Sequence, residues 1–170
     1  MPEPSEHEPV EQMRAEAKRI HESAVYCSQG HLEAAKRWRA WHWSGGILAA
    51  GLGTLGAVLT FADCSAVLAG SLTVIGAIVA ATMTGVRPDK FAERAQTSGN
   101  DYVSLRNDAR RFVNIDLPTS AVADSRDLLE ELANRASQLD HAADPIPKRA
   151  YERARKNISS GGQDFEVDQE

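Results

Sequence analysis

Charged residues are missing from a long stretch of this 170-residue chain. Of its 19 Lys and Arg residues and 24 Asp and Glu residues, only Asp63 lies between Ile47 and Val86. A soluble domain alternates apolar and polar faces along its elements, so this stretch argues against a single water-soluble globule. Basic residues are also outnumbered: the net charge is −5, which argues against a nucleic-acid partner.

The uncharged stretch has the length of two membrane spans. Residues 43–61 and 65–86 are each close to the roughly 20 helical residues that cross a bilayer core of about 30 Å. Backbone groups in lipid must be bonded within their own helix, so we expect a hairpin over residues 43–86 with an outer turn at 62–64. The alternative is a hairpin buried in a large soluble assembly.

The flanking charges predict the orientation. The first 42 residues are polar, so the apolar segment begins too late for a signal peptide. Lys and Arg residues flank both spans and are missing from the turn, which places both termini in the cytoplasm and the outer-turn residues Asp63 and Cys64 outside. Three tryptophans fit an interfacial belt on the inner face, or packing between helices, or both: Trp38, Trp41 and Trp43.

Small residues recur every four positions along both predicted spans, which favours close helix contacts in lipid. Two such faces suggest a homo-oligomer in the bilayer, and hydroxyl side chains nearby are expected to bond across helices or line a polar lumen. Asp63 is more simply a turn residue than part of an acidic ring at a pore mouth. The predicted packing residues are Gly45, Ala49, Gly53 and Ala57 on the first span and Ala69, Thr73, Ala77, Ala81 and Gly85 on the second.

The polar flanks are predicted to be helical. From Val10 to Trp41, apolar or small residues recur at alternating steps of three and four, a coiled-coil register that makes residues 1–42 a cytoplasmic helix. Residues 87–158 are expected to form further cytoplasmic helices. The first of these is expected to return along the N-terminal helix. The glycine in Ser98–Asn100 can kink it, and Pro118 is expected to end it.

Two more helices are predicted before the tail. One covers Ser125–Ala143, with Ser125 as its N-cap, and a short basic helix covers Lys148–Ile158. The basic helix is more simply a solvated face than a site for anionic lipid or a nucleotide. The acidic, Gly-containing segment 159–170 is predicted to be disordered. The fold class is therefore all-α: a transmembrane hairpin with long helical extensions into a cytoplasmic bundle.

Residues that carry chemistry are scarce. The two cysteines, Cys27 and Cys64, are predicted on opposite sides of the membrane and cannot pair within one chain. The five histidines have no metal-ligand spacing, and no nucleophile–base pair or paired carboxylates are found. Residues 51–56 match G-x-G-x-x-G, but they lie inside a predicted span with no strand before them. We expect no enzyme active site, no metal and no cofactor.

The order of segments resembles the bacterial SLATT domain family, two-span membrane proteins associated with SMODS nucleotidyltransferases and SLOG nucleotide-sensing domains. The resemblance is carried by His31–Arg39 before the first span, Tyr102–Arg106 and Arg110–Phe112 in the returning helix, and Pro145–Tyr151 before the basic helix. It covers residues 10–158. It implies a membrane effector of a bacterial conflict or anti-phage system, without catalytic residues.

The expected function follows from that resemblance. A nucleotide-derived signal, made by a partner nucleotidyltransferase or detected by a nucleotide-sensing protein, would trigger pore formation or disruption of the inner membrane. We expect no fused domain of either kind in this chain, so sensing would come from a separate protein or from the short cytoplasmic helices. The alternatives are a non-conducting membrane-anchored adaptor or scaffold, and a small regulatory subunit of a transporter.

Overall fold

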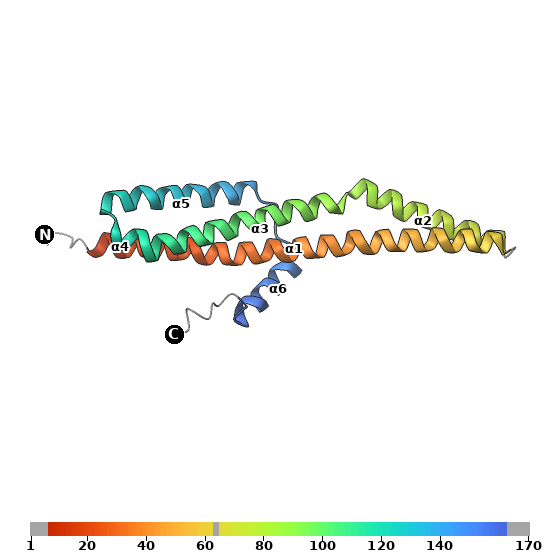
Figure 1. The fold of residues 1–170 in the computed structure, drawn as a ribbon, viewed down its shortest axis with the longest axis horizontal. Coiled ribbons are helices and arrows are strands. Elements are labelled where there is room, and N and C mark those ends of the chain that lie inside the picture. Colours follow the sequence, from red (N-terminus) through yellow and green to blue (C-terminus); the bar gives the residue numbers. More distant parts are fainter. Residues whose placement is uncertain (1–6, 63–64, 163–170) are drawn as a thin grey trace. The chain divides into compact units, whose positions relative to one another are not determined.

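The computed structural model describes residues 7–62 and 65–162, which form helices and no strand. Helix α1 (His7–Phe61) is continuous over 55 residues, and α2 (Ala66–Val86) follows it. Helix α3 (Pro88–Arg111) leads through a π-helix, η1 (Phe112–Asp116), into the single turn α4 (Leu117–Thr119). Helices α5 (Val122–Ala142) and α6 (Lys148–Ser159) complete the all-α fold, as predicted (Figure 1).

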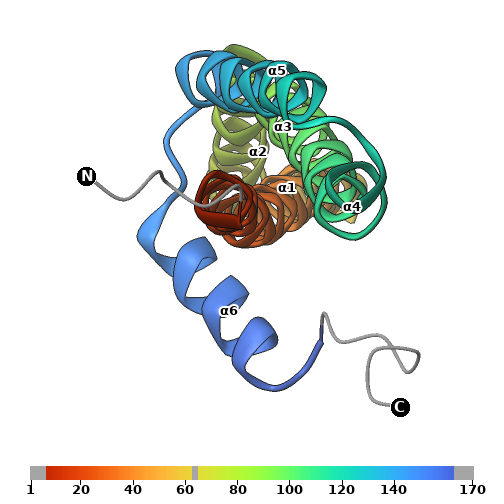
Figure 2. The same ribbon diagram turned by 90° about the vertical axis from the view of Figure 1, so that its left-hand side faces the viewer.

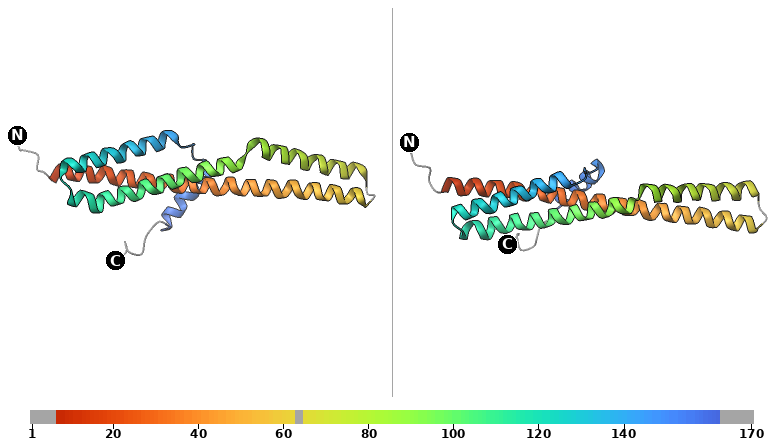
Figure 3. Two further views of the ribbon diagram at one scale, coloured as in Figure 1. Left: turned by 45° about the horizontal axis from the view of Figure 1, so that its top comes forward. Right: turned by 90° about the horizontal axis from the view of Figure 1, so that it is seen from above.

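The chain divides into two compact units, each described by itself. The hairpin unit is Ala35–Arg94, and the bundle unit comprises Met1–Ala34 together with Ala95–Glu170. Two helices of the chain are long and apolar enough to cross a membrane. In the hairpin unit, α2 runs back beside the second half of α1 (Figure 3).

Arg87 separates α2 from α3. Its backbone is left-handed (φ 52°), and its N–H donates to Met83 O at 3.0 Å, closing α2. The next residue is Pro88, and a residue before proline is disfavoured in the right-handed helical region. The returning polypeptide is therefore two helices, where one continuous extension of the second span was expected.

The core of the bundle unit follows the predicted register of α1. Met13, Ala17, Ile20 and Ala24 are buried, and they pack with residues of the other helices of this unit. Those partners are Tyr102, Leu105 and Ala109 from α3, Phe112 and Val113 from η1, Leu117 from α4 and Leu132 from α5. Spacing by three and four residues thus identified the buried face of α1 correctly.

Helix α3 runs without a break through Ser98–Asn100, where a kink was predicted. Gly99 allows a close helix contact there: a methyl group would lie 2.9 Å from Cγ of Leu32 on α1. Gly is costly inside a helix, and here the absent side chain makes room for a neighbouring leucine.

The returning helical run ends at Thr119, one residue beyond the predicted end at Pro118. The wider turn of η1 precedes it, where Leu117 N–H donates to Phe112 O five residues back. Pro118 then occupies the first turn of α4, where a helix does not need the missing N–H.

Ser125 is not an N-cap. Helix α5 begins at Val122 with Ala121 at the cap position, so Ser125 lies inside the helix. Its side chain is buried, and its Oγ has no hydrogen-bond partner in the described part of the chain. Helix α6 ends at Ser159, one residue beyond the predicted end. Most of the predicted disordered tail, from residue 163 onward, lies outside the described residues.

The first prediction concerns the bundle core. We expect Phe112→Ala to lower the free energy of unfolding by about 3–5 kcal/mol, because this ring is fully buried and its loss leaves a cavity. The matched control is Ile115→Ala on the same π-helix, where the side chain is exposed. Denaturant unfolding of the full chain in detergent measures both, and equal losses would contradict the assignment of the core.

Candidate functional site

The two helices of the hairpin unit meet along one line of residues, here called the seam. Along both helices these residues are buried or half-buried, while most of their neighbours are exposed. The steps alternate between three and four residues, as in helices that cross at a shallow angle. The seam consists of Gly45, Ala49, Leu52, Gly56 and Leu59 on α1 and Ala69, Leu72, Gly76, Val79 and Met83 on α2.

Glycines bring the two backbones together at the seam. A methyl group at Gly76 would lie 3.1 Å from Ala49 O and 3.2 Å from Gly53 N, so at this point backbone lies against backbone. A methyl group at Gly56 would meet Thr73 Oγ1 and Ala69 O, and one at Gly45 would meet Met83. Small residues allow this close approach of two helix backbones.

The structure separates the predicted packing residues into two groups. Gly45, Ala49 and Ala69 lie in the seam, and Gly53 is half-buried beside Gly76. Thr73 is exposed, but its Oγ1 would meet a methyl group placed on Gly56. The remaining members face away from the seam: Ala57, Ala77, Ala81 and Gly85.

The separation has a geometric cause. A row of residues four apart turns by about 40° per step around a helix, so it leaves a straight contact line after two or three members. Alternating steps of three and four stay on the line. That spacing was the signal for Gly56 and Gly76, two close seam contacts that the sequence analysis missed.

Hydroxyl groups of the hairpin bond within their own helices. Six of them donate to a carbonyl four residues earlier and make no bond across the seam, which differs from the first of the two expectations, bonding across helices. In lipid this satisfies a hydroxyl that has no water to bind. The six residues are Thr54, Thr60, Ser71, Thr73, Thr82 and Thr84.

The three tryptophans have different surroundings. Trp38 stacks on Phe91 of α3 with ring centroids 4.9 Å apart. The guanidinium carbon of Arg94 lies 5.7 Å from the centroid of the same Phe91 ring. Trp41 contacts Trp38 and is 42% exposed, and Trp43 is 67% exposed. Trp38 is thus a packing residue, while Trp43 is open to its surroundings, as a belt residue would be. The predicted outer turn, Asp63 and Cys64, lies outside the described residues.

A cluster of polar side chains lies in the core of the bundle unit. Tyr102 donates its hydroxyl to Asp140 at 2.7 Å, and its ring stacks on buried His31 with centroids 5.6 Å apart. Burial lowers the pKa of His31, opposed by the carboxylate of Asp144, and burial together with Asp140 raises the pKa of Cys27. Burial and the bond to Asp140 also raise the pKa of Tyr102. Neutral groups are therefore favoured here, and Cys27 is poorly suited to act as a nucleophile.

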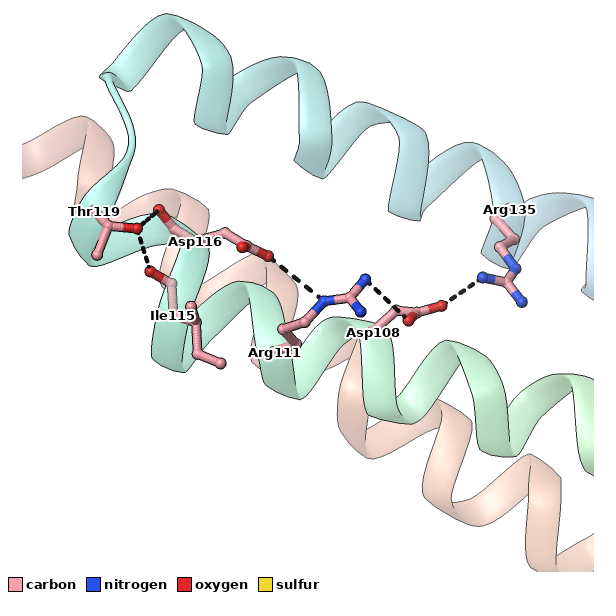
Figure 4. Close-up of polar contacts among 6 residues, drawn as sticks. All are labelled: Asp108, Arg111, Ile115, Asp116, Thr119 and Arg135. Atoms are coloured by element: carbon pink, nitrogen blue, oxygen red, sulfur yellow. Dashed lines mark hydrogen bonds and ion pairs between the residues drawn. The ribbon is translucent and has the colours of Figure 1, made fainter.

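Charged residues connect η1 to α5 (Figure 4). Arg111 lies 3.3 Å from Asp108 and 4.0 Å from Asp116, and Arg135 of α5 forms an ion pair with the same Asp108. Thr119 Oγ1 donates to Ile115 O at 2.7 Å, which closes the turn after the π-helix. A small cavity of about 170 Å³ lies beside this network, between η1 and α5. The described residues contain no group of three or more His, Cys, Asp or Glu able to hold a metal ion.

The second prediction tests the seam. Gly76→Leu should separate α1 from α2, because a side chain there collides with the backbone of α1, whereas Gly70→Leu on the same helix enters open space. Spin labels on cysteines replacing exposed Val58 and Val67, in a chain with Cys27→Ser and Cys64→Ser, report the distance. A broadened distribution is expected for Gly76→Leu alone, and an unchanged one would refute the seam.

The third prediction concerns acid. The pKa of His31 is lowered from 6.5 in the folded chain, so below about pH 6.5 the unfolded chain binds more protons and the free energy of unfolding falls. His21, with its pKa lowered by burial and Arg106, acts in the same direction. His31→Gln should reduce the loss of melting temperature between pH 7.5 and 5.5, and His42→Gln, at an exposed position, should not. Identical slopes for wild type and His31→Gln would disprove this.

No family model matches the chain, and comparison with curated proteins and with solved structures finds no match either. The functional argument therefore rests on the hairpin and the bundle themselves.

Proposed function

We propose that the chain is a two-pass inner-membrane protein with both termini in the cytoplasm, which oligomerises and perturbs the membrane. The observation that carries the proposal is the exposure of the hairpin. Only 11% of the most apolar 18-residue window in each candidate span is buried within the chain. A soluble monomer rarely exposes apolar surface on this scale, so lipid or further copies must cover it.

The outward face of the hairpin supports assembly. Ala57, Ala77 and Ala81 are exposed, and a methyl group at Gly46 or Gly70 would meet nothing within 4 Å. The seam already uses its own small residues, so these outward ones are not needed to close the hairpin. Their proposed role is contact between copies, where backbones approach closely in lipid.

The proposed activity is that of an effector in a bacterial conflict or anti-phage system. A signal derived from a nucleotide, supplied by a partner nucleotidyltransferase or a nucleotide-sensing protein, would shift the assembly to a membrane-perturbing state. Such a shift needs a difference in affinity between the two states. The bundle unit is the part of the chain proposed to receive the signal. Support for this step is the resemblance to the SLATT family.

The fourth prediction tests the proposal in bacterial cells that overproduce the chain, using a membrane-potential dye. Wild type and Val74→Leu should depolarise the membrane, because Val74 is already a large exposed residue. Ala77→Leu should abolish depolarisation by blocking contact between copies. The hairpin itself should still fold, because Ala77 is exposed and lies outside the seam. Gly76→Leu should abolish it by opening the seam.

Membrane insertion is checked by flotation of each variant. An inserted wild-type protein that leaves the potential intact would refute the membrane-perturbing effector and favour a non-conducting adaptor or a transporter subunit. Depolarisation by Ala77→Leu equal to that of wild type would refute assembly through this face.

A further inference from the structure

Helix α6 presents a basic surface on a helix that is held in place by packing. Ala150 and Ala154 are buried in the bundle unit, and Asn157 Nδ2 donates to Gln29 Oε1 of α1 at 3.5 Å. Ile146, just before the helix, fills the space beside Gly30 of α1. The outward arc, here called the basic face, carries one acid, Glu152, and five exposed cations: Lys148, Arg149, Arg153, Arg155 and Lys156.

The cations of the basic face have no acidic partner in the described part of the chain. None of the five lies within 4 Å of a carboxylate there. Elsewhere, Arg14, Lys90 and Arg111 each pair with an acid three residues away on the same helix. A concentrated positive surface on a chain of net charge −5 is therefore available to an external anionic group.

Helix α5 carries the complementary surface. An open groove of about 560 Å³ is lined by residues of α5 and contains three carboxylates, Asp127, Glu130 and Glu131. None of these lies within 4 Å of a cation among the described residues. The one arginine at the groove, Arg135, pairs with Asp108 (Figure 4). Its guanidinium also donates to Ser104 Oγ. The other lining residues are Asn134 and Gln138.

The basic face is shorter than the groove, and the two surfaces lie apart within one chain. The groove from Asp127 to Gln138 covers eleven helical steps, about 16 Å, and the basic face from Lys148 to Lys156 covers eight, about 12 Å, so the face fits within the groove. Within the bundle unit, α5 and α6 lie on opposite sides of α1 (Figure 2). Because α6 is packed on α1, it does not reach the groove of its own chain.

We propose that the basic face of α6 docks in the acidic groove of α5 on a second copy of this chain. The contact is heterologous, since each copy offers a different surface on each side, and such contacts build rings or open rows. Individual surface ion pairs contribute little, so the contact is weak between free molecules. Confinement of copies in one membrane raises their effective concentration. That last step rests on the proposed function; the docking itself does not.

The fifth prediction uses a photo-crosslinking amino acid at Asn134, in full-length chains in vesicles of neutral phosphatidylcholine. The wild-type groove should crosslink to α6 of another copy, as mapped by mass spectrometry. A groove variant (Asp127→Lys with Glu130→Lys) and a face variant (Arg149→Glu with Arg153→Glu) should each lose at least five-fold in crosslinked dimer. Arg126→Glu, exposed on α5 outside the groove, should lose nothing.

Mixing the groove and face variants provides the decisive arm. Within each variant, the groove and the face carry charges of the same sign, so copies of one variant repel each other. In the mixture, the Lys-substituted groove of the groove variant meets the Glu-substituted face of the face variant. The basic face of the groove variant likewise meets the acidic groove of the face variant. Crosslinking should therefore return in the mixture, and also in one chain carrying all four substitutions. Added salt should weaken it, since exposed charges are screened.

Three results would overturn the docking: crosslinks that ignore charge reversal, crosslinks that map away from α6, or a mixture that stays uncrosslinked. If α6 instead binds lipid, the face variant alone should lose binding to vesicles that contain anionic lipid, and mixing should restore nothing. Thermal melting of each variant checks folding. Crosslinking without depolarisation in cells would refute the membrane-perturbing function while leaving the docking intact.

Discussion

The hairpin unit carries more apolar surface than its own two helices can cover, and the rest of the molecule is arranged around that constraint. A backbone in an apolar surrounding must bond within itself, so both segments are helices and their hydroxyls bond to their own carbonyls. Charged residues other than Asp63 are excluded from residues 47–86 and lie in the segments on either side of that stretch.

Close approach of backbones is what makes the hairpin a unit. At Gly76 the backbone of α2 lies against Ala49 and Gly53 of α1, and no side chain is left between them to fill space. The seam consumes one face of each helix. The small residues on the other faces, such as Ala77 and Ala81, remain outside the hairpin. Folding of the hairpin and contact between copies thus depend on different residues in the proposed assembly.

The bundle unit uses charge in two ways. Near η1, Asp108 joins Arg111 and Arg135, so acids and bases neutralise one another inside the chain. The basic face of α6 and the acidic groove of α5 do not, and they lie on opposite sides of α1 (Figure 2). In the core, burial favours the neutral forms of His31 and Tyr102, which keeps charge at the surface of the unit.

The sequence by itself determined the all-α class, the lengths of the two apolar helices and the buried register of α1, because charge-free length and three–four spacing are local properties of the chain. It did not determine the seam: a row every four residues and a line at steps of three and four share Gly45 and Ala49, and only the partner helix selects between them. It also did not determine that Gly99 lies against Leu32 of α1. Ser125 has a local preference for a cap position, but it lies inside α5 because that helix starts at Val122. Tertiary structure alone placed α5 and α6 on opposite sides of α1, because packing across helices depends on residues far apart in the chain.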